Sequence, residues 1–379
     1  MKKIKVMSVF GTRPEAIKMC PLVKELQSRK EIESIVCVTG QHREMLKQVL
    51  DIFNVVPKYN LDIMRDKQSL TTITTGVLEK IEDVLEKEKP DIVLVHGDTS
   101  TSFSAALASF YKQIPVGHVE AGLRTYNIYS PFPEEMNRKL ISQIAEMHFA
   151  PTLRNESNLK NESITKNVFV TGNTVMDAFK YTLKDNYRFK CDILNSIDYS
   201  KGRTILLTAH RRENLGKPLE EICTAVGKLI EKYEDIKVIY PVHLNPAVRE
   251  TAHRILDKYD RAFLIDPVDV EDMHNVMSRS YLIMTDSGGL QEEGPHLGIP
   301  VVVLRTETER PEAVEAGTVV VAGNTLDDVF DSVSELLDDK VKYKTMSKAI
   351  NPYGDGHASE RICDCIINHF TEKAVNTED

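Results

Sequence analysis

The chain has 379 residues, which is more than one typical hydrophobic core holds, so we expect two domains. Its 41% hydrophobic and 28% charged residues are an ordinary balance for a soluble globular protein. The formal net charge of −9 argues against a nucleic-acid-binding surface, and no apolar run is long enough to span a membrane.

The N-terminus and the cysteines indicate a cytoplasmic protein. The apolar stretch after the first lysines ends at Arg13 and has the pattern of a strand, not of a signal peptide. The six cysteines are scattered, which favours reduced thiols. Cys363 and Cys365 form a C-x-C pair, but no second pair completes a metal site, so we interpret them as ordinary helical thiols.

Strand-like and helix-like segments alternate along the first part of the chain. The expected strands are β-branched and apolar, and most are followed by a helical pattern, which is typical of a parallel sheet buried on both faces. The expected strands occupy residues 4–10, 34–40, 91–98, 115–122, 147–152 and 168–172, and the expected helices residues 21–29, 43–53, 101–112 and 134–146.

The alternation restarts after a polar, irregular stretch, residues 173–202, which we interpret as a hinge and linker. Strands are expected at residues 204–210, 237–243, 262–268, 281–289, 301–305 and 319–323, and helices at 219–233, 245–259, 326–339 and 358–370. The pattern therefore predicts two doubly wound α/β halves with a cleft between them. The expected domains are residues 1–170 and 171–350, followed by a C-terminal segment, 351–379.

Polar side chains gather where the expected strands end, and ligands of open parallel sheets bind at those ends. A single residue of this kind could be a helix cap, but so many together indicate a site. In the first half they are Gly11, Arg13, His96, Asp98, His118 and Glu120, and in the second His210, Arg211, Arg212, Glu213, His243, Asp286, Ser287, Gly288, Gly289 and Arg305.

The segment DSGGLQEEG, residues 286–294, indicates a nucleotide diphosphate site. Ser-Gly-Gly between a strand and a helix exposes backbone N–H groups at the positive end of the helix. Glu292 and Glu293 follow one turn later, where a carboxylate could accept hydrogen bonds from ribose hydroxyls or simply favour the helix dipole. The pattern is neither G-x-G-x-x-G nor a Walker loop, so NAD is not indicated.

The opening GTRPEAIKM and three carboxylates complete the candidate site. Pro14 suits the start of a helix, and Arg13 and Lys18 lie about one turn apart on a similar face, although Lys18 could equally be a solvated helix residue. Asp98, Glu120 and Glu134 would repel a phosphate unless they transfer protons. A divalent metal is the rival interpretation, but these segments hold no Asp-x-Asp pair.

Ten motifs together resemble the non-hydrolysing UDP-N-acetylglucosamine 2-epimerases, of the type found in Gram-positive bacteria. The resemblance extends from residue 4 to about residue 368. The motifs are GTRPEAIKM, HGDTSTSFSAALA, GHVEAGLRT, PFPEEMNR, FVTGNTVMDA, TAHRREN, PVHLNP, TDSGGLQEE, TERPEA and NPYGDGHAS.

This resemblance implies the glycosyltransferase-B architecture, with two Rossmann-like domains, an interdomain cleft and a C-terminal helix that crosses back to the first domain. It implies interconversion of UDP-GlcNAc and UDP-ManNAc without NAD or metal, by elimination of UDP to 2-acetamidoglucal and its re-addition. The implied catalytic residues are Asp98, Glu120, Glu134 and His210, and the implied substrate-binding residues are Arg13, Lys18, Val268, Met273, Ser287, Gly288, Gly289, Glu293 and Arg310. Many relatives have an aromatic residue where this chain has Met273.

Bacterial relatives carry a second, regulatory UDP-GlcNAc site. This chain has Glu44 where glutamine is usual and Lys67 where arginine is usual, and lysine cannot make the planar two-pronged contact with phosphate. The matching positions are Gln41, His42, Glu44, Lys67, Gln68, Glu134, Arg211 and His243.

Other activities fit the same pattern. They are a UDP-sugar glycosyltransferase, a hydrolysing 2-epimerase, an enzyme for a different UDP-sugar, and a nucleotide-binding protein without catalysis. The carboxylates and the NPYGDG segment favour the epimerase. From the resemblance we also expect a homodimer, with UDP, UDP-GlcNAc and UDP-ManNAc as ligands, that supplies ManNAc for a teichoic-acid linkage unit or capsule.

Overall fold

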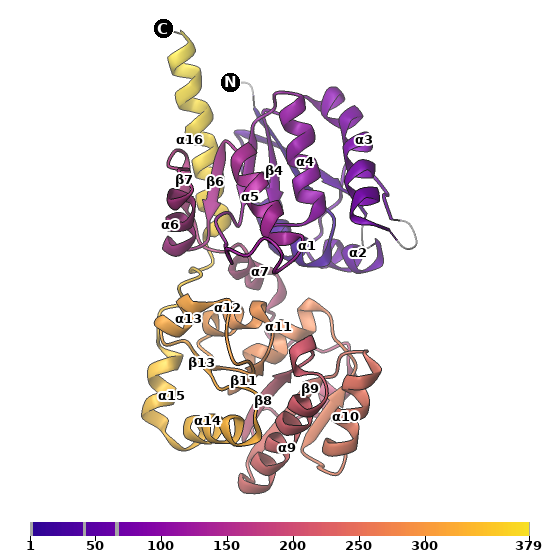
Figure 1. Ribbon diagram of the computed structural model, residues 1–379, viewed down its shortest axis with the longest axis vertical. Coiled ribbons are helices and arrows are strands. Elements are labelled where there is room, and N and C mark those ends of the chain that lie inside the picture. Colours follow the sequence, from indigo (N-terminus) through magenta and orange to yellow (C-terminus); the bar gives the residue numbers. More distant parts are fainter. Residues whose placement is uncertain (1–2, 41–42, 65–67, 379) are drawn as a thin grey trace. The chain divides into compact units, whose positions relative to one another are not determined.

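The computed structural model describes residues 3–40, 43–64 and 68–378, and the chain forms two compact units. Unit 1 comprises Met1–Tyr181 and Tyr353–Asp379, and unit 2 comprises Thr182–Pro352 (Figure 1). Unit 1 thus includes residues 171–181, which the sequence analysis placed in the second domain. Within the described part of the chain, no helix combines the length and the apolar character needed to cross a membrane.

Unit 1 is built on a seven-stranded parallel sheet in the order β3-β2-β1-β4-β5-β6-β7. The strands are β1 (Ile4–Phe10), β2 (Ile32–Val38), β3 (Tyr59–Asn60), β4 (Ile92–His96), β5 (Val116–Val119), β6 (Met147–Ala150) and β7 (Val168–Val170). The helices are α1 (Arg13–Ser28), α2 (Arg43–Ile52), α3 (Leu70–Glu88), α4 (Ser100–Tyr111), α5 (Glu134–Ile144), α6 (Leu153–Asn161), α7 (Val175–Thr182) and α16 (Ala358–Glu378).

Alternation along β1 divides the core of unit 1 into two layers. Val6 and Phe10 pack on one face of the sheet, with apolar residues of α1, α2 and α16. Met7 and Val9 pack on the other face, with residues of α3, α4 and α5. Because both faces are covered, β4 is buried along its whole length, as the continuous apolar run predicts.

Two segments near the expected boundary are ordered parts of unit 1. Residues 175–182 form helix α7, in which Val175, Met176 and Phe179 are buried, so this part of the predicted linker is core. The yellow helix α16 of Figure 1 packs against α1 through Ile362 and Ile366. Residue Cys363 lies in the same core, which fits a packing role for that thiol.

Unit 2 has a six-stranded parallel sheet in the order β10-β9-β8-β11-β12-β13. The strands are β8 (Arg203–Thr208), β9 (Ile236–Pro241), β10 (Ala262–Ile265), β11 (Leu282–Thr285), β12 (Val301–Val303) and β13 (Val319–Val321). The helices are α8 (Asp192–Ser196), the 3-10 helix η1 (Arg212–Asn214), α9 (Lys217–Lys232), α10 (Pro246–Leu256), α11 (Val270–Ser278), α12 (Gly288–His296), α13 (Pro311–Glu315), α14 (Leu326–Asp338) and α15 (Lys340–Ser347). The prediction of two doubly wound parallel-sheet domains is confirmed.

Candidate active site

Strands β1, β4 and β5 are neighbours in unit 1, so their carboxyl ends bring three polar segments together. The segment after β1 contains Arg13, the segment after β4 contains Asp98, and Glu120 follows β5 directly. The sheet therefore places at one edge residues that are up to about 100 positions apart in the sequence. This is the arrangement that the strand-end pattern predicts.

The turn between β1 and α1 is fixed by a buried carboxylate that the sequence analysis did not single out. Glu15 Oε2 accepts hydrogen bonds from the backbone N–H groups of Gly11 (3.0 Å) and Thr12 (2.7 Å). Its Oε1 accepts from Thr99 Oγ1 (2.6 Å) and Ser102 Oγ (2.9 Å), so the same carboxylate ties this turn to the start of α4. The T-x-x-E spacing, a capping box, was the available signal.

Gly11 and Arg13 explain why the first strand ends where it does. A Cβ on Gly11 would lie 1.9 Å from Thr39 Oγ1, so only glycine fits between β1 and the residue that follows β2. Arg13 is the first residue of α1 and is partly exposed. Arg13 therefore follows the end of β1 closely, and its contact with an anion stays a prediction.

Glu120 is the most constrained of the three predicted catalytic carboxylates. Its backbone adopts the left-handed conformation, with φ of 62°. Its Oε2 is ion-paired with Lys18 and accepts a hydrogen bond from Asn173 Nδ2 at 2.9 Å. Lys18, which we expected to point at the ligand, thus engages Glu120, and an adjacent ammonium group favours the ionised carboxylate.

His96 lies beside this carboxylate at the end of β4. Its Nε2 is 3.8 Å from Glu120 Oε2 and makes no hydrogen bond among the described residues. The side chain is almost completely buried, and burial lowers the pKa of His96, although Glu120 opposes that effect. A neutral imidazole is therefore expected next to the Glu120–Lys18 pair.

Asp98 and Glu134 are placed by the loop after β4 and by the first turn of α5. Asp98 Oδ2 accepts from Arg138 Nε at 2.9 Å and Nη2 at 2.7 Å. Asn137 Nδ2 donates to the backbone carbonyl of Asp98 at 2.8 Å, so residues of α5 bind both the side chain and the backbone of Asp98. Glu134 is the first residue of this helix, and its buried Oε2 has no hydrogen-bond partner among the described residues.

Unit 2 presents a second set of polar groups at the carboxyl ends of β8, β9 and β11. His210 and His243 stack with ring centroids 5.1 Å apart and an interplanar angle of 7°. Asp286 is fully buried, and its Oδ2 accepts from the backbone N–H groups of His210 and Arg211, both at 2.7 Å, and from Asn214 Nδ2 at 3.0 Å. Asp286 therefore holds the turn that carries His210.

The His210 ring lies near the same aspartate. Asp286 Oδ1 lies 3.7 Å from His210 Nδ1 and has no hydrogen-bond partner in the described part of the chain. Burial lowers the pKa of His210, the Asp286 carboxylate works in the opposite direction, and His243 and Arg211 add to the lowering. The ring is still 39% exposed, so a ligand can reach it.

The amino terminus of α12 has the features of an anion site. Ser287 is its N-cap residue but makes no side-chain capping hydrogen bond, and Gly288 and Gly289 form the first turn. A Cβ on Gly288 would be 3.5 Å from Arg310 Nη2, so the guanidinium lies directly beside this turn. Arg310 is held there by an ion pair with Glu292, and a helix terminus with an adjacent cation attracts phosphate.

The remaining predicted ligand residues lie near that helix or at the start of α11. Glu293 is 3.3 Å from His274 Nε2, and His274 Nδ1 is 2.7 Å from Thr182 Oγ1. Val268 precedes α11 and Met273 lies in its first turn, both partly exposed. The roles predicted for these three residues, a carboxylate for ribose and apolar side chains for a base, stay predictions.

Only part of the predicted regulatory site lies within the described residues. Gln41, His42 and Lys67 fall outside them. In unit 1, Glu44 is exposed in α2, and Gln68 Nε2 donates to the Ile63 carbonyl at 2.5 Å. The other members are Glu134 in unit 1 and Arg211 and His243 in unit 2.

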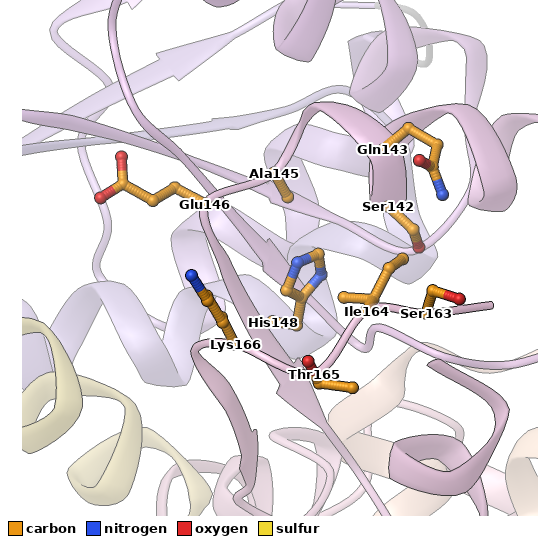
Figure 2. A pocket seen from close by; sticks show the side chains of 9 residues that line it. All are labelled: Ser142, Gln143, Ala145, Glu146, His148, Ser163, Ile164, Thr165 and Lys166. Carbon is orange, nitrogen blue, oxygen red and sulfur yellow. The ribbon is translucent and has the colours of Figure 1, made fainter. Parts of the chain in front are cut away.

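A cavity of about 300 Å³ lies elsewhere in unit 1, near the amino ends of β6 and β7 (Figure 2). Glu146 and Lys166 mark one end of it and Gln143 the other, with the His148 ring between them. None of the residues predicted for the active site lines this cavity. It is therefore separate from the carboxyl-end groups described above.

Several known proteins are similar to this chain over nearly its whole length. A Bacillus subtilis UDP-N-acetylglucosamine 2-epimerase is 53% identical over 98% of this chain and 97% of its own. An S. aureus MnaA–UDP structure matches with a TM-score of 0.86 and 53% identity, covering 98% and 97% of the two chains. A Neisseria meningitidis UDP-GlcNAc 2-epimerase bound to UDP-GlcNAc matches with a TM-score of 0.85 and 46% identity, covering 96% and 100%.

Similarity in fold extends beyond these proteins. The Streptomyces nogalater glycosyltransferase SnogD has a TM-score of 0.62 at 11% identity, over 96% of this chain and 100% of its own, which shows the shared glycosyltransferase-B fold. The family model described as UDP-N-acetylglucosamine 2-epimerase matches residues 24–367. The chain therefore belongs to the UDP-N-acetylglucosamine 2-epimerase family.

Proposed function

We propose that this protein interconverts UDP-GlcNAc and UDP-ManNAc by inverting C2 of the sugar. The observation that carries the proposal is that unit 1 places several carboxylates at one edge of its sheet. Glu120 forms an ion pair with Lys18 there, and Asp98 forms an ion pair with Arg138. A protein that only binds a nucleotide has no need of such groups. Relatives that bind UDP and UDP-GlcNAc support the choice of substrate.

In this proposal, unit 2 holds the nucleotide. The N–H groups of Ser287, Gly288 and Gly289 receive the diphosphate at the start of α12, with Arg310 as the adjacent cation. Glu293 accepts hydrogen bonds from the ribose hydroxyls, and Val268 and Met273 contact the uracil. Unit 1 contributes the cations Arg13 and Lys18.

The chemistry is an elimination followed by an addition. A carboxylate removes the proton from C2, the C1–O bond breaks, and its electron pair leaves with UDP, which gives 2-acetamidoglucal. UDP then adds back at C1 while a proton returns to the opposite face of C2. C2–H is a weak acid, so the step needs both an ionised base and a stabilised leaving group.

The described groups suit these roles. Lys18 and Asn173 favour the ionised form of Glu120, which suits it to act as a base. Asp98 and Glu134 are the other proposed proton-transfer groups, and two faces of C2 must be served. His210, on the turn whose backbone Asp286 holds, stabilises the charge that develops on the departing UDP. Elimination and re-addition involve no oxidation at any step, so we propose that the reaction needs no NAD. That it needs no metal is the expectation from the family resemblance.

Chromatography of the products tests this proposal. Protein treated with EDTA and given only UDP-GlcNAc should form UDP-ManNAc up to a constant ratio, with little free sugar. Accumulation of ManNAc and UDP would instead identify a hydrolysing enzyme, and UDP release that requires an added acceptor would identify a transferase. Glu120→Gln should lose turnover but still bind UDP, because the proposed UDP groups belong to unit 2.

The regulatory site, the homodimer and the supply of ManNAc to a surface polysaccharide remain predictions from the family resemblance. Activation is tested by the dependence of rate on UDP-ManNAc concentration. A sigmoidal curve that becomes hyperbolic with traces of UDP-GlcNAc supports the second site. A hyperbolic curve that UDP-GlcNAc does not change contradicts it.

A further inference from the structure

The Glu120 carboxylate lies among side chains from three different elements. Lys18 reaches it from α1, Asn173 from the loop before α7, and His96 lies 3.8 Å away at the end of β4. Among the described residues, the carboxylates of Glu15 and Asp98 also act electrostatically on His96. Lys18 carries a charge, whereas Asn173 is a neutral donor to Glu120.

Asn173 is itself fixed at three points. Its side chain is buried, with 3% of the residue exposed. Its backbone N–H donates to the Tyr353 carbonyl at 2.7 Å, and its Oδ1 accepts from the backbone N–H of Val175 at 3.1 Å. The remaining part of the amide, Nδ2, is thereby directed at Glu120 Oε2. The amide cannot rotate without losing a hydrogen bond.

The contact with Tyr353 depends on two glycines. A Cβ on Gly354 would lie 3.1 Å from the Gly172 Cα, and both residues have positive φ, +118° and +88°. The NPYGDG segment, residues 351–356, can therefore approach residues 172–173 only if both positions are glycine. Arg361 secures the segment, because it donates to Asp355 at 2.8 and 2.6 Å and to the Thr171 carbonyl at 3.1 Å.

We propose that Asn173 is a positioning residue for the Glu120 carboxylate, and that the NPYGDG segment acts by holding Asn173 in place. The inference rests on the proposed function, in which Glu120 exchanges a proton with C2. The Asn173 amide restricts the carboxylate to one orientation. An aspartate in its place would instead put a second negative charge beside Glu120. This gives the NPYGDG segment, more than 200 residues from Glu120 in the sequence, a role in the reaction.

The decisive variant is Asn173→Asp. It keeps the size of the side chain and an acceptor for the Val175 N–H, but it replaces the donor to Glu120 with a negatively charged acceptor. A neighbouring like charge raises the pKa of a carboxylate by about 1 unit or more. We expect the acidic limb of the kcat profile to move up by about 1 pH unit, and the plateau kcat to fall about tenfold. KM for UDP-GlcNAc should change less than about threefold.

Two further variants separate positioning from folding. Asn155→Asp is the matched control, because Asn155 is a buried asparagine of the same unit that caps α6, and its pH profile should follow that of the wild type. Asn173→Ala removes the donor without adding charge, so kcat should fall with KM and UDP binding retained. Circular dichroism and urea unfolding check that unit 1 of each variant is folded, because Asn173 and Asn155 both belong to that unit. Calorimetry with UDP then checks that the proposed nucleotide groups of unit 2 still bind.

The outcomes are distinct. A wild type that epimerises, with an Asn173→Asp profile that coincides with it, overturns the positioning role and leaves the proposed function standing. If Asn173→Asp does not fold, an unchanged kcat in Asn173→Ala overturns the role in the same way. A wild type that leaves UDP-GlcNAc unchanged at every pH overturns the proposed function and this assignment together.

Discussion

Two buried histidines of unit 1 should make its stability fall steeply in mild acid. His118 on β5 lies opposite His148 on β6 in the sheet register, and both are almost completely buried. Burial lowers the pKa of His118 to about 3, and that of His148 to about 4 with a further contribution from Arg124. Both rings are therefore neutral in the folded protein at pH 5.

The sign and size of the effect follow from the proton balance. In the unfolded chain each ring has a pKa near 6.5, so it binds a proton as the pH falls below that value, while the folded form does not. The stability contribution is complete above pH 6.5 and is lost between about pH 6.5 and the folded pKa values. At pH 5 each histidine costs about 2 kcal/mol, or about 4 kcal/mol for the pair.

Urea unfolding at pH 7.5 and pH 5.0 measures this loss, with a short proteolysis pulse to identify the transition of unit 1. The change in unfolding free energy between the two pH values should be smaller by about 2 kcal/mol in His118→Gln and in His148→Gln than in the wild type. Each variant is compared with itself at the two pH values, so the packing cost of the substitution, which is the same at both, cancels. His253→Gln, at an exposed position in unit 2, is the control. Equal pH dependence in all four proteins would refute the reasoning.

Three further predictions concern single positions. Asp286→Ala leaves three donors without their acceptor, including the backbone N–H groups of His210 and Arg211, and urea unfolding should show unit 2 destabilised by about 3 kcal/mol. Because Asp286 holds the turn that carries His210, kcat should also fall, and an undiminished kcat would contradict this role. Gly122→Ala combines φ of +88° with a Cβ 2.2 Å from the Asn155 carbonyl oxygen, so it should lower Tm by several degrees, and an unchanged Tm would be inconsistent with this turn. Glu134→Gln should reduce kcat about 100-fold with UDP affinity intact, and a wild-type rate would remove it from proton transfer.

The sequence was sufficient for the fold because the signals involved are local. Buried strands such as β4 appear as continuous apolar runs, and strand-helix alternation predicts parallel sheets. The stretch after residue 172 was misjudged, because its polar character hides the short buried helix α7 (Val175–Thr182). Its buried face is set by contacts with segments distant in sequence, including the backbone N–H groups of Ala358 and Ser359, which donate to Asp177.

The sequence analysis named candidate site residues, but it did not predict which of them contact one another. Strand ends identify Asp98, Glu120 and His210, since a parallel sheet brings its carboxyl ends together. The ion pair between Lys18 and Glu120 joins residues 102 positions apart, and no pattern in one sequence indicates such a partner. The same holds for Arg138 beside Asp98, whereas Glu15 could have been found from its capping-box spacing.

The central claim is that the enzyme exchanges the proton at C2 and that its products are still UDP-sugars at equilibrium. Proton NMR of the protein with UDP-GlcNAc in D2O, without NAD or added metal, tests this claim most directly. The proposed mechanism predicts that UDP-ManNAc appears and that deuterium replaces the C2 proton in both epimers. UDP-GlcNAc that stays intact and fully protonated at C2 would contradict it.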